Sequence, residues 1–220
     1  MYSWDFYPIL QSTDLLLHGL WLTFEYAAGS IFFGIIIGLI ACYCRLSRYK
    51  VLNAIARIYL ELFRCTPLLV QVLWFYYAFP MLIGINIDNQ VAAILALSLY
   101  VGSFYAEIFR GGVKAVDSGQ HEAASALAMS QSQLMWRIIV PQAGKKMLPA
   151  FINQSVIQVK NTSLASVISV AELSYMAAVV NGETYRPLES YSTVAILYFI
   201  LIFPLTQFAD RFEKYLARFD

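Results

Sequence analysis

Residues 26–44 read YAAGSIFFGIIIGLIACYC, nineteen residues without a charged side chain. A helix needs about 20 mainly apolar residues to cross the hydrocarbon core of a bilayer. A further stretch, residues 147–171, is long enough to span but contains Lys160 and many Asn, Gln, Ser and Thr side chains. Three more apolar stretches qualify: CTPLLVQVLWFYYAFPMLIGINI (65–87), NQVAAILALSLYVGSFYA (89–106) and SYSTVAILYFILIFPLTQFA (190–209). The sequence therefore predicts an all-α membrane protein with about five transmembrane helices.

The composition of the whole chain agrees with a bilayer environment. Of its 220 residues 60% are hydrophobic and 13% are charged, whereas soluble proteins carry about 25% charged residues. Long apolar runs without alternation also exclude a membrane β-barrel. The formal net charge of +1 leaves no excess of basic side chains for nucleic acid. We therefore expect the surface of this protein to contact a lipid bilayer and not nucleic acid.

The distribution of Lys and Arg predicts the orientation. Twelve of these residues lie after the first span, between the third and fourth spans, or after the last span, and only Arg186 lies in the opposite segments. Basic residues accumulate in cytoplasmic loops. We expect the N-terminus outside the cell and the C-terminus in the cytoplasm. Residues 1–220 would form one transmembrane domain with a cytoplasmic loop at about 111–146.

This loop contains two helix starts. Asp117, or the serine after it, can cap a first helix, and Ser130 with Gln133 forms a capping-box pattern for a second. We expect Pro141 and Gly144 to end that second helix. The alanine-rich surface of residues 123–128 could enter a groove of another protein, or it could belong to a connector lying on the membrane surface.

The motifs of the chain resemble those of a known family. The run EAASALAMS (122–130), followed by IIVPQA (138–143), is similar to the EAA loop of the membrane subunits of ATP-binding-cassette (ABC) importers. The whole set resembles the polar amino acid branch of the type I importer permeases. The other motifs occur in the same order: RLS (45–47), ELFRCTPLLVQ (61–71), YAEIFRGG (105–112), GQHEAA (119–124), LPAFINQ (148–154), KNTSL (160–164) and AEL (171–173).

The resemblance implies a type I importer permease fold and a transport function. The chain would be the transmembrane permease subunit of a binding-protein-dependent importer that moves a polar amino acid across the bacterial cytoplasmic (inner) membrane. The implied partners are two ABC ATPase subunits, an extracytoplasmic solute-binding protein, and a second permease copy or a sister permease. The loop residues implied in coupling to the ATPase are Gln120, Glu122, Ala123, Ala124 and Ala128.

Two positions depart from the family pattern. The family usually has glycine where this chain has Ala128 and Cys65. Alanine is tolerated where the backbone is right-handed and helical, but it is strained in a left-handed turn. The backbone conformation at Ala128 therefore decides whether the substitution affects the loop.

The sequence contains no site for ATP hydrolysis. There is no GxxxxGK[ST] phosphate-binding motif, and no acidic residue is placed to hold magnesium. The three cysteines and two histidines show no metal-ligand spacing. We therefore expect no catalytic residue, no cofactor and no metal in this chain, and we expect a partner subunit to supply the energy.

The polar span contains the candidate substrate path. A charge near the bilayer centre costs about 2.5 to 3.5 kcal/mol on insertion scales, so Lys160 is a candidate functional residue. It could instead form a structural ion pair with one of four acids, namely Glu25, Glu61, Glu107 or Glu172. The other candidates for the path are Asn153, Gln154, Gln158, Asn161, Thr162 and Ser163.

Two alternatives remain open from the residues alone. An ion-coupled secondary transporter or channel subunit would work without an ATPase, but such carriers usually show an internal repeat, and none is found here. The spacing of Gly34 and Gly38 favours close helix packing. This packing could occur between two permease copies or within one chain.

Overall fold

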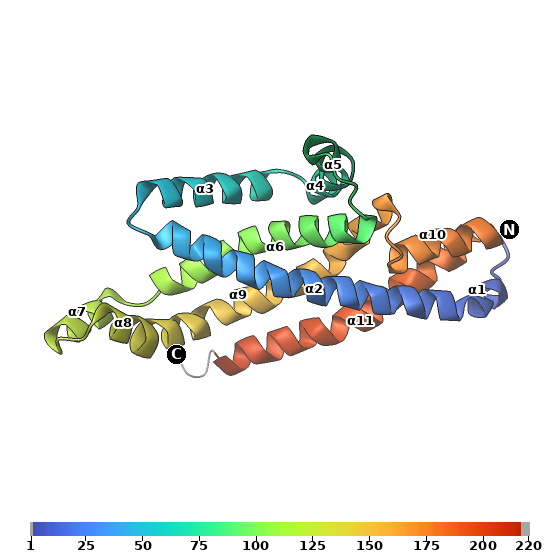
Figure 1. The fold of residues 1–220 in the computed structure, drawn as a ribbon. Helices are drawn as coiled ribbons and strands as arrows, with labels where there is room; N and C mark the ends of the chain where they lie inside the picture. Colours follow the sequence, from blue (N-terminus) through green and yellow to red (C-terminus); the bar gives the residue numbers. More distant parts are fainter. Residues whose placement is uncertain (1, 217–220) are drawn as a thin grey trace.

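The computed structural model describes residues 2–216, with side chains through residue 214. All regular elements in this part are helices, which confirms the predicted all-α class. Figure 1 shows the long helices side by side in an elongated bundle. The elements are α1 (Tyr7–Gln11), α2 (Thr13–Leu46), α3 (Lys50–Cys65), α4 (Leu68–Leu73), the π-helix η1 (Trp74–Ala78), α5 (Phe79–Ile83), α6 (Asn89–Lys114), α7 (Ser118–Ala126), α8 (Gln131–Leu134), the π-helix η2 (Met135–Ile139), α9 (Val140–Asn161), the 3₁₀ helix η3 (Thr162–Ile168), α10 (Leu173–Thr184) and α11 (Pro187–Leu216).

Three helices, α2, α6 and α11, are each long and apolar enough to cross a membrane. Two bent pairs meet the same criteria when each is taken as one span. Helix α3 pairs with Leu68–Ile83 across a bend of 108°, and Gln131–Ile168 pairs with α10 across a bend of 47°. The structure thus contains three to five candidate spans, in agreement with the predicted number of about five.

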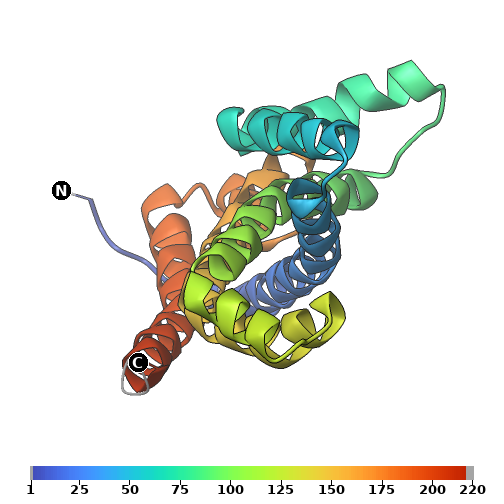
Figure 2. The ribbon, with the colours of Figure 1, turned by 90° about the vertical axis from the view of Figure 1, so that its left-hand side faces the viewer.

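The stretch 65–87 does not form the single straight helix that its hydropathy suggests. Helix α3 ends at Cys65, and Thr66 is extended, with φ −108° and ψ 142°. The residue before a proline is disfavoured in the helical region, so Pro67 imposes the break. After it, the segment from Leu68 to Ile83 leaves at 108° to α3 and extends sideways from the other helices (Figure 2).

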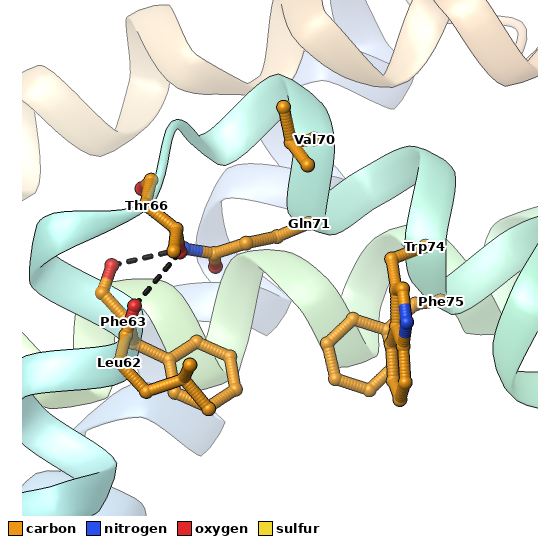
Figure 3. A pocket seen from close by; sticks show the side chains of 7 residues that line it. All are labelled: Leu62, Phe63, Thr66, Val70, Gln71, Trp74 and Phe75. Atoms are coloured by element: carbon orange, nitrogen blue, oxygen red, sulfur yellow. Dashed lines mark hydrogen bonds between the residues drawn. The ribbon is translucent and has the colours of Figure 1, made fainter.

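Gln71 holds this bend together. Its Nε2 donates hydrogen bonds to the carbonyl oxygens of Phe63 (2.9 Å) and Thr66 (3.1 Å) and to Oγ1 of Thr66 (2.7 Å), as Figure 3 shows in part. Carbonyl groups at a helix end have no partner within the helix, and lipid supplies none. The Gln71 side chain supplies the missing donor. Beside it lies an apolar cavity of about 340 Å³, lined by Leu62, Phe63, Thr66, Val70, Gln71, Trp74 and Phe75.

We expect Gln71→Leu to destabilise the protein by about 1 to 3 kcal/mol, because carbonyl groups at the end of α3 lose their buried donor. Thermal unfolding in detergent measures this loss. Val70→Ala is a matched control, because Val70 lies next to Gln71 with an exposed side chain, and its effect should stay within about 0.5 kcal/mol. Equal stability of the Gln71→Leu and parent proteins would contradict this role.

Both π-helices lie directly before a proline. Helix η1 ends two residues before Pro80, and η2 ends two residues before Pro141. Proline cannot donate a backbone hydrogen bond, and its ring clashes with the carbonyl one turn earlier. A π turn widens the helix there and accommodates the ring. The prediction that Pro141 and Gly144 end the second loop helix is therefore wrong, because α8, η2 and α9 continue without a break to residue 161.

Helices α2 and α6 form the centre of the bundle. The face of α2 toward α6 carries small residues, including Ser30, Gly34 and Gly38, and all three are buried. A Cβ atom placed on Gly38 would lie 2.7 Å from Cβ of Tyr105 and 3.1 Å from the carbonyl oxygen of Gly102. The Gly34 and Gly38 pair thus serves helix packing within the chain.

Candidate functional site

The loop between α6 and α9 forms one end of the bundle (Figure 1). The Asp117 side chain caps α7 by accepting a hydrogen bond from the backbone N–H of Gly119 at 2.6 Å. At the start of α8, Ser130 Oγ accepts from the N–H of Gln133, and the Gln133 side chain accepts from the N–H of Ser130. The predicted arrangement of helix, turn and helix, with its capping box, is confirmed.

A small apolar core fixes this loop to the bundle. Val116, Ala124, Leu134, Ile139 and Ala143 are buried together. They come from the turn after α6 and from α7, α8, η2 and α9, and Val113 of α6 packs against them, so the core joins the loop to both long helices that it connects. The Nζ of Lys146 also donates a hydrogen bond to the carbonyl oxygen of Ala115 at 2.6 Å. These contacts link the loop to α6 and α9.

The residues implied in ATPase coupling have different positions in the loop. Glu122, Ala123 and Ala128 are exposed, and Gln120 is half-buried. Ala124 is only 1% exposed, so it packs inside the loop. Leu127, which belongs to the predicted surface of residues 123–128 but not to the five residues implied in coupling, is 75% exposed at the C-cap of α7.

Ala128 ends helix α7 in a left-handed conformation, with φ +52°. The N–H of Met129 bonds to the carbonyl of Ala124 at 3.0 Å, and the N–H of Ala128 bonds to that of Ser125 at 3.0 Å. These two bonds define a Schellman motif, whose left-handed position is usually glycine. The alanine is therefore strained here. Cys65, in contrast, lies in the last turn of α3, where a side chain causes no such strain.

We expect Ala128→Gly to stabilise the loop by about 1 kcal/mol, because glycine adopts a positive φ without the clash of a Cβ atom. Hydrogen exchange of the amides in residues 118–134 measures the local opening of the loop. The control is Ala123→Gly inside α7, which should destabilise the loop by about 1 kcal/mol. Equal effects of the two glycine substitutions would refute the strain at Ala128.

A polar groove runs between α9 and α11. Its volume is about 520 Å³. Lys160 and Asn153 lie on one face of α9, seven residues apart, and Asp210 and Glu213 of α11 carry charges of the opposite sign to the lysine. The groove therefore carries charged side chains of both signs along its length. Its complete lining is Lys146, Pro149, Ala150, Asn153, Val156, Ile157, Lys160, Thr206, Ala209, Asp210 and Glu213.

Of the seven residues predicted for the substrate path, the structure places only Asn153 and Lys160 in this groove. Gln158 is fully buried and donates to Ser30 Oγ at 3.1 Å and to the carbonyl of Leu97 at 3.2 Å. It therefore connects α9 to α2 and α6.

The remaining four candidates, in α9 and at the start of η3, do not line this groove. Thr162 and Ser163 donate to carbonyl oxygens one turn earlier, at 2.8 Å each. Asn161 donates to Oε1 of Gln158 at 3.4 Å, and Gln154 is half-buried. The helix does not break at Asn161 but tightens into η3.

Lys160 forms no ion pair with the described residues, and three of the four acids considered as its partner have other contacts. Glu61 pairs with Arg57 at 2.7 Å, and Glu107 pairs with Arg110. Glu172 is buried and accepts hydrogen bonds from the N–H of Tyr175 (2.9 Å) and the hydroxyl of Tyr198 (2.7 Å). The fourth, Glu25, has an exposed side chain. A structural ion pair within the described part of the chain therefore does not explain Lys160.

Known transport proteins match this chain over nearly its whole length. The arginine transport system permease protein ArtQ of Bacillus subtilis is 32% identical over 98% of this chain and 99% of its own. The glutamine transport system permease protein GlnP of Escherichia coli K12 is 34% identical over 96% and 97%.

Solved structures give the same result for the fold. A chain from the crystal structure of an amino acid ABC transporter with histidines superposes with a TM-score of 0.91 at 34% identity, over 97% of this chain and all of that one. A chain of the MetNI methionine ABC transporter, in an inward-facing conformation, superposes with a TM-score of 0.75 at 21% identity, over 94% and 98%. At that identity the second match supports the fold alone.

The expected resemblance to importer permeases is confirmed, and nothing in these comparisons supports an ion-coupled carrier. Residues 30–219 match the family described as the binding-protein-dependent transport system inner membrane component. With relatives above 30% identity over almost the full chain, the protein belongs to this family of inner-membrane ABC importer permeases.

Proposed function

We propose that this chain is the permease subunit through which an ABC importer carries a polar amino acid into the cell. The match at 34% identity to a solved amino acid ABC transporter, over 97% of this chain, carries the proposal. The transport systems named for the relatives, arginine and glutamine, support the same substrate class. A family member of this kind works with an ATPase and a binding protein.

We place the subunit as one domain, residues 1–220, with the N-terminus outside and the C-terminus in the cytoplasm. The excess of Lys and Arg on one side, twelve against one, supports this orientation. The α7–α8 loop then faces the cytoplasm and one of two ATPase subunits, and the solute-binding protein docks at the opposite end. A second copy or a sister permease completes the assembly.

The loop geometry supports a coupling mechanism. Glu122, Ala123 and Leu127 are exposed and form the surface offered to the ATPase. Ala124 lies in the apolar core beneath them, and the strained turn at Ala128 fixes the end of α7. Because this core packs on α6 and α9, movement of the loop is transmitted to the helix that carries Lys160.

The groove between α9 and α11 supports the proposal that the substrate path runs along α9. Lys160 can bind the carboxylate of an amino acid, and Asn153 can donate and accept hydrogen bonds beside it. Asp210 and Glu213 can bind its ammonium group. These groups line one groove, so the path would present both signs of charge along its length.

Reconstitution tests the proposed function. We expect the permease, assembled with its ATPase and binding protein in proteoliposomes, to concentrate a radiolabelled polar amino acid only when ATP is supplied to the ATPase side. A panel of acidic, basic and amide amino acids identifies the substrate. Uptake by the permease alone, driven by an ion gradient without ATP, would contradict the proposal.

We expect the double variant Glu122→Arg, Ala123→Trp to lower amino acid uptake at least about tenfold, which corresponds to about 1.4 kcal/mol of lost coupling. Both side chains are exposed, so the loop should still fold. Uptake and ATP hydrolysis are measured in the same vesicles. Ser132→Arg on the exposed side of α8 is the control and should retain transport. Normal uptake in the double variant would exclude this surface from coupling.

A further inference from the structure

Residues 2–6, which we call the N-terminal strap, are fixed to the start of α11. The carboxylate of Glu189 is fully buried. It accepts hydrogen bonds from the hydroxyl of Tyr2 and from the backbone N–H of Asp5, the second at 3.0 Å. Nη2 of Arg186 lies 3.9 Å from Oδ2 of Asp5, and the guanidinium lies 6.0 Å from the ring centre of Tyr2. Several contacts therefore hold the strap in one conformation.

The strap presents an ordered but exposed tryptophan. The ring of Trp4 stacks on that of Phe6, with the centroids 5.7 Å apart and the planes 4° from parallel, and the ring of Tyr2 meets it edge-on at 5.8 Å. Trp4 is nevertheless 58% exposed. An aromatic side chain that is already ordered loses little conformational entropy when a partner covers it.

Tyr185 lies in the two-residue turn between α10 and α11, in a left-handed conformation with φ +53°. A bulky side chain is strained in this conformation, and helices that end in this way usually carry glycine there. Burial of the ring could compensate for the strain, but Tyr185 is 85% exposed. A strained side chain that is not buried by the fold indicates a role outside the chain.

The strap and the turn form one surface, because Arg186 follows Tyr185 directly and contacts the strap. We call Tyr2, Trp4, Tyr185 and Arg186 the aromatic patch. It lies at the end of the bundle opposite the α7–α8 loop (Figure 1), which the proposed orientation places outside the cell. Tyrosine, tryptophan and arginine are the residue types enriched at the hot spots of protein interfaces.

The charge around the aromatic patch favours a protein over lipid head groups. The segments on this side of the bundle, residues 1–14, 79–90 and 181–189, contain five acidic side chains and one basic side chain, Arg186, so their net charge is −4. Negative charge repels the phosphate groups of lipids and attracts a protein surface that carries Lys and Arg. The five acids are Asp5, Asp14, Asp88, Glu183 and Glu189.

We propose that the solute-binding protein of this importer docks on the aromatic patch, with Trp4 and Tyr185 inserted into two apolar pockets that basic side chains surround. The inference rests on the proposed function and its orientation, and it names the residues that contact one partner. Glu189 and Arg186 connect the patch to the start of α11. Docking would therefore act on the helix that forms one wall of the Lys160 groove.

Titration of the importer in lipid nanodiscs with its fluorescently labelled binding protein tests this proposal. We expect Tyr185→Gly and Trp4→Ala each to weaken binding at least about tenfold, as truncation of an interface hot spot does. Tyr185→Gly should not unfold at a lower temperature than the parent, because glycine adopts a positive φ without strain. The matched control is Tyr43→Ala, because Tyr43 is 76% exposed near the opposite end of α2, and its binding should be unchanged.

Photo-crosslinking identifies what covers the patch. With the photoreactive amino acid benzoylphenylalanine in place of Tyr185, we expect crosslinks to the binding protein. Crosslinks only to lipid or to a second permease copy would overturn the proposal, and so would parent-like binding in both Tyr185→Gly and Trp4→Ala. If Trp4→Ala does not assemble, Tyr185→Gly and the crosslink decide the question.

ATP-dependent uptake by the parent importer separates this inference from the proposed function. If the parent imports an amino acid and the patch variants bind the binding protein normally, only the inference fails. If the binding protein docks through the patch but the complete importer moves no amino acid, the proposed function fails and the docking surface remains.

Discussion

Replacing Gly38 with leucine is expected to destabilise the folded protein strongly. Any Cβ atom at this position would lie 2.7 Å from Cβ of Tyr105, 3.1 Å from the carbonyl oxygen of Gly102 and 3.2 Å from the backbone nitrogen of Ala106. Two of these neighbours are backbone atoms, which cannot rotate away. Overpacking a filled core costs typically 1 to 3 kcal/mol, and we expect about 3 kcal/mol here, because α2 would separate from α6. The yield of monodisperse protein in detergent and its thermal unfolding measure the effect.

The control for this prediction is Gly111→Leu. Gly111 also lies in a helix, but a Cβ atom there would have no neighbour within 4 Å. Helix propensity favours leucine over glycine by roughly 0.5 to 1 kcal/mol, so this variant should be at least as stable as the parent. A Gly38→Leu protein with the stability of the parent would show that α2 and α6 are not in the close contact described here.

Replacing Lys160 with methionine is expected to reduce the apparent affinity for the transported amino acid about 10- to 100-fold. A hydrogen bond to a charged group contributes about 1.5 to 3 kcal/mol, and methionine keeps the length of the side chain without its charge. ATP-dependent uptake as a function of substrate concentration measures this change. Because Lys160 forms no ion pair within residues 2–216, the thermal stability should not fall.

Two variants make this prediction specific. Lys160→Arg should recover part of the affinity, because it restores the positive charge. Lys145→Met removes a lysine that is exposed and does not line the groove, so uptake should be unchanged. If Lys160→Met retains full affinity but unfolds at a lower temperature, the lysine is structural and does not bind the substrate.

The features that depend on local sequence were predictable. The length of the apolar stretches identified the candidate spans, because a helix needs about 20 apolar residues to cross a bilayer regardless of the rest of the chain. The caps at Asp117 and Ser130 were also predictable, since each involves a side chain and a backbone group two or three residues away.

The errors arose where tertiary structure decides the outcome. Hydropathy averages over Thr66 and Pro67, so it could not detect the bend of 108°. The π-helix before Pro141 compensates for the proline, and no composition signal indicates such a turn.

The candidate site was predictable in residue type but not in position. The polar span does line a polar groove, yet only its register against α11 places Asn153 and Lys160 in that groove and turns Gln158 toward α2 and α6. Similarly, alanines on all sides of α7 do not reveal that Ala124 packs inward.

The π-helix η2 has a geometric consequence for the link between the loop and the groove. A π turn holds one residue more than an α turn, and each residue of an α-helix advances the azimuth by about 100°. Residues 135–139 thus rotate the side of α9 that meets α11 about the helix axis, relative to the direction in which α8 points its side chains. Inserting or deleting one residue in η2 would therefore turn the groove to a different direction relative to the loop. The side chains of α9 itself would be unchanged.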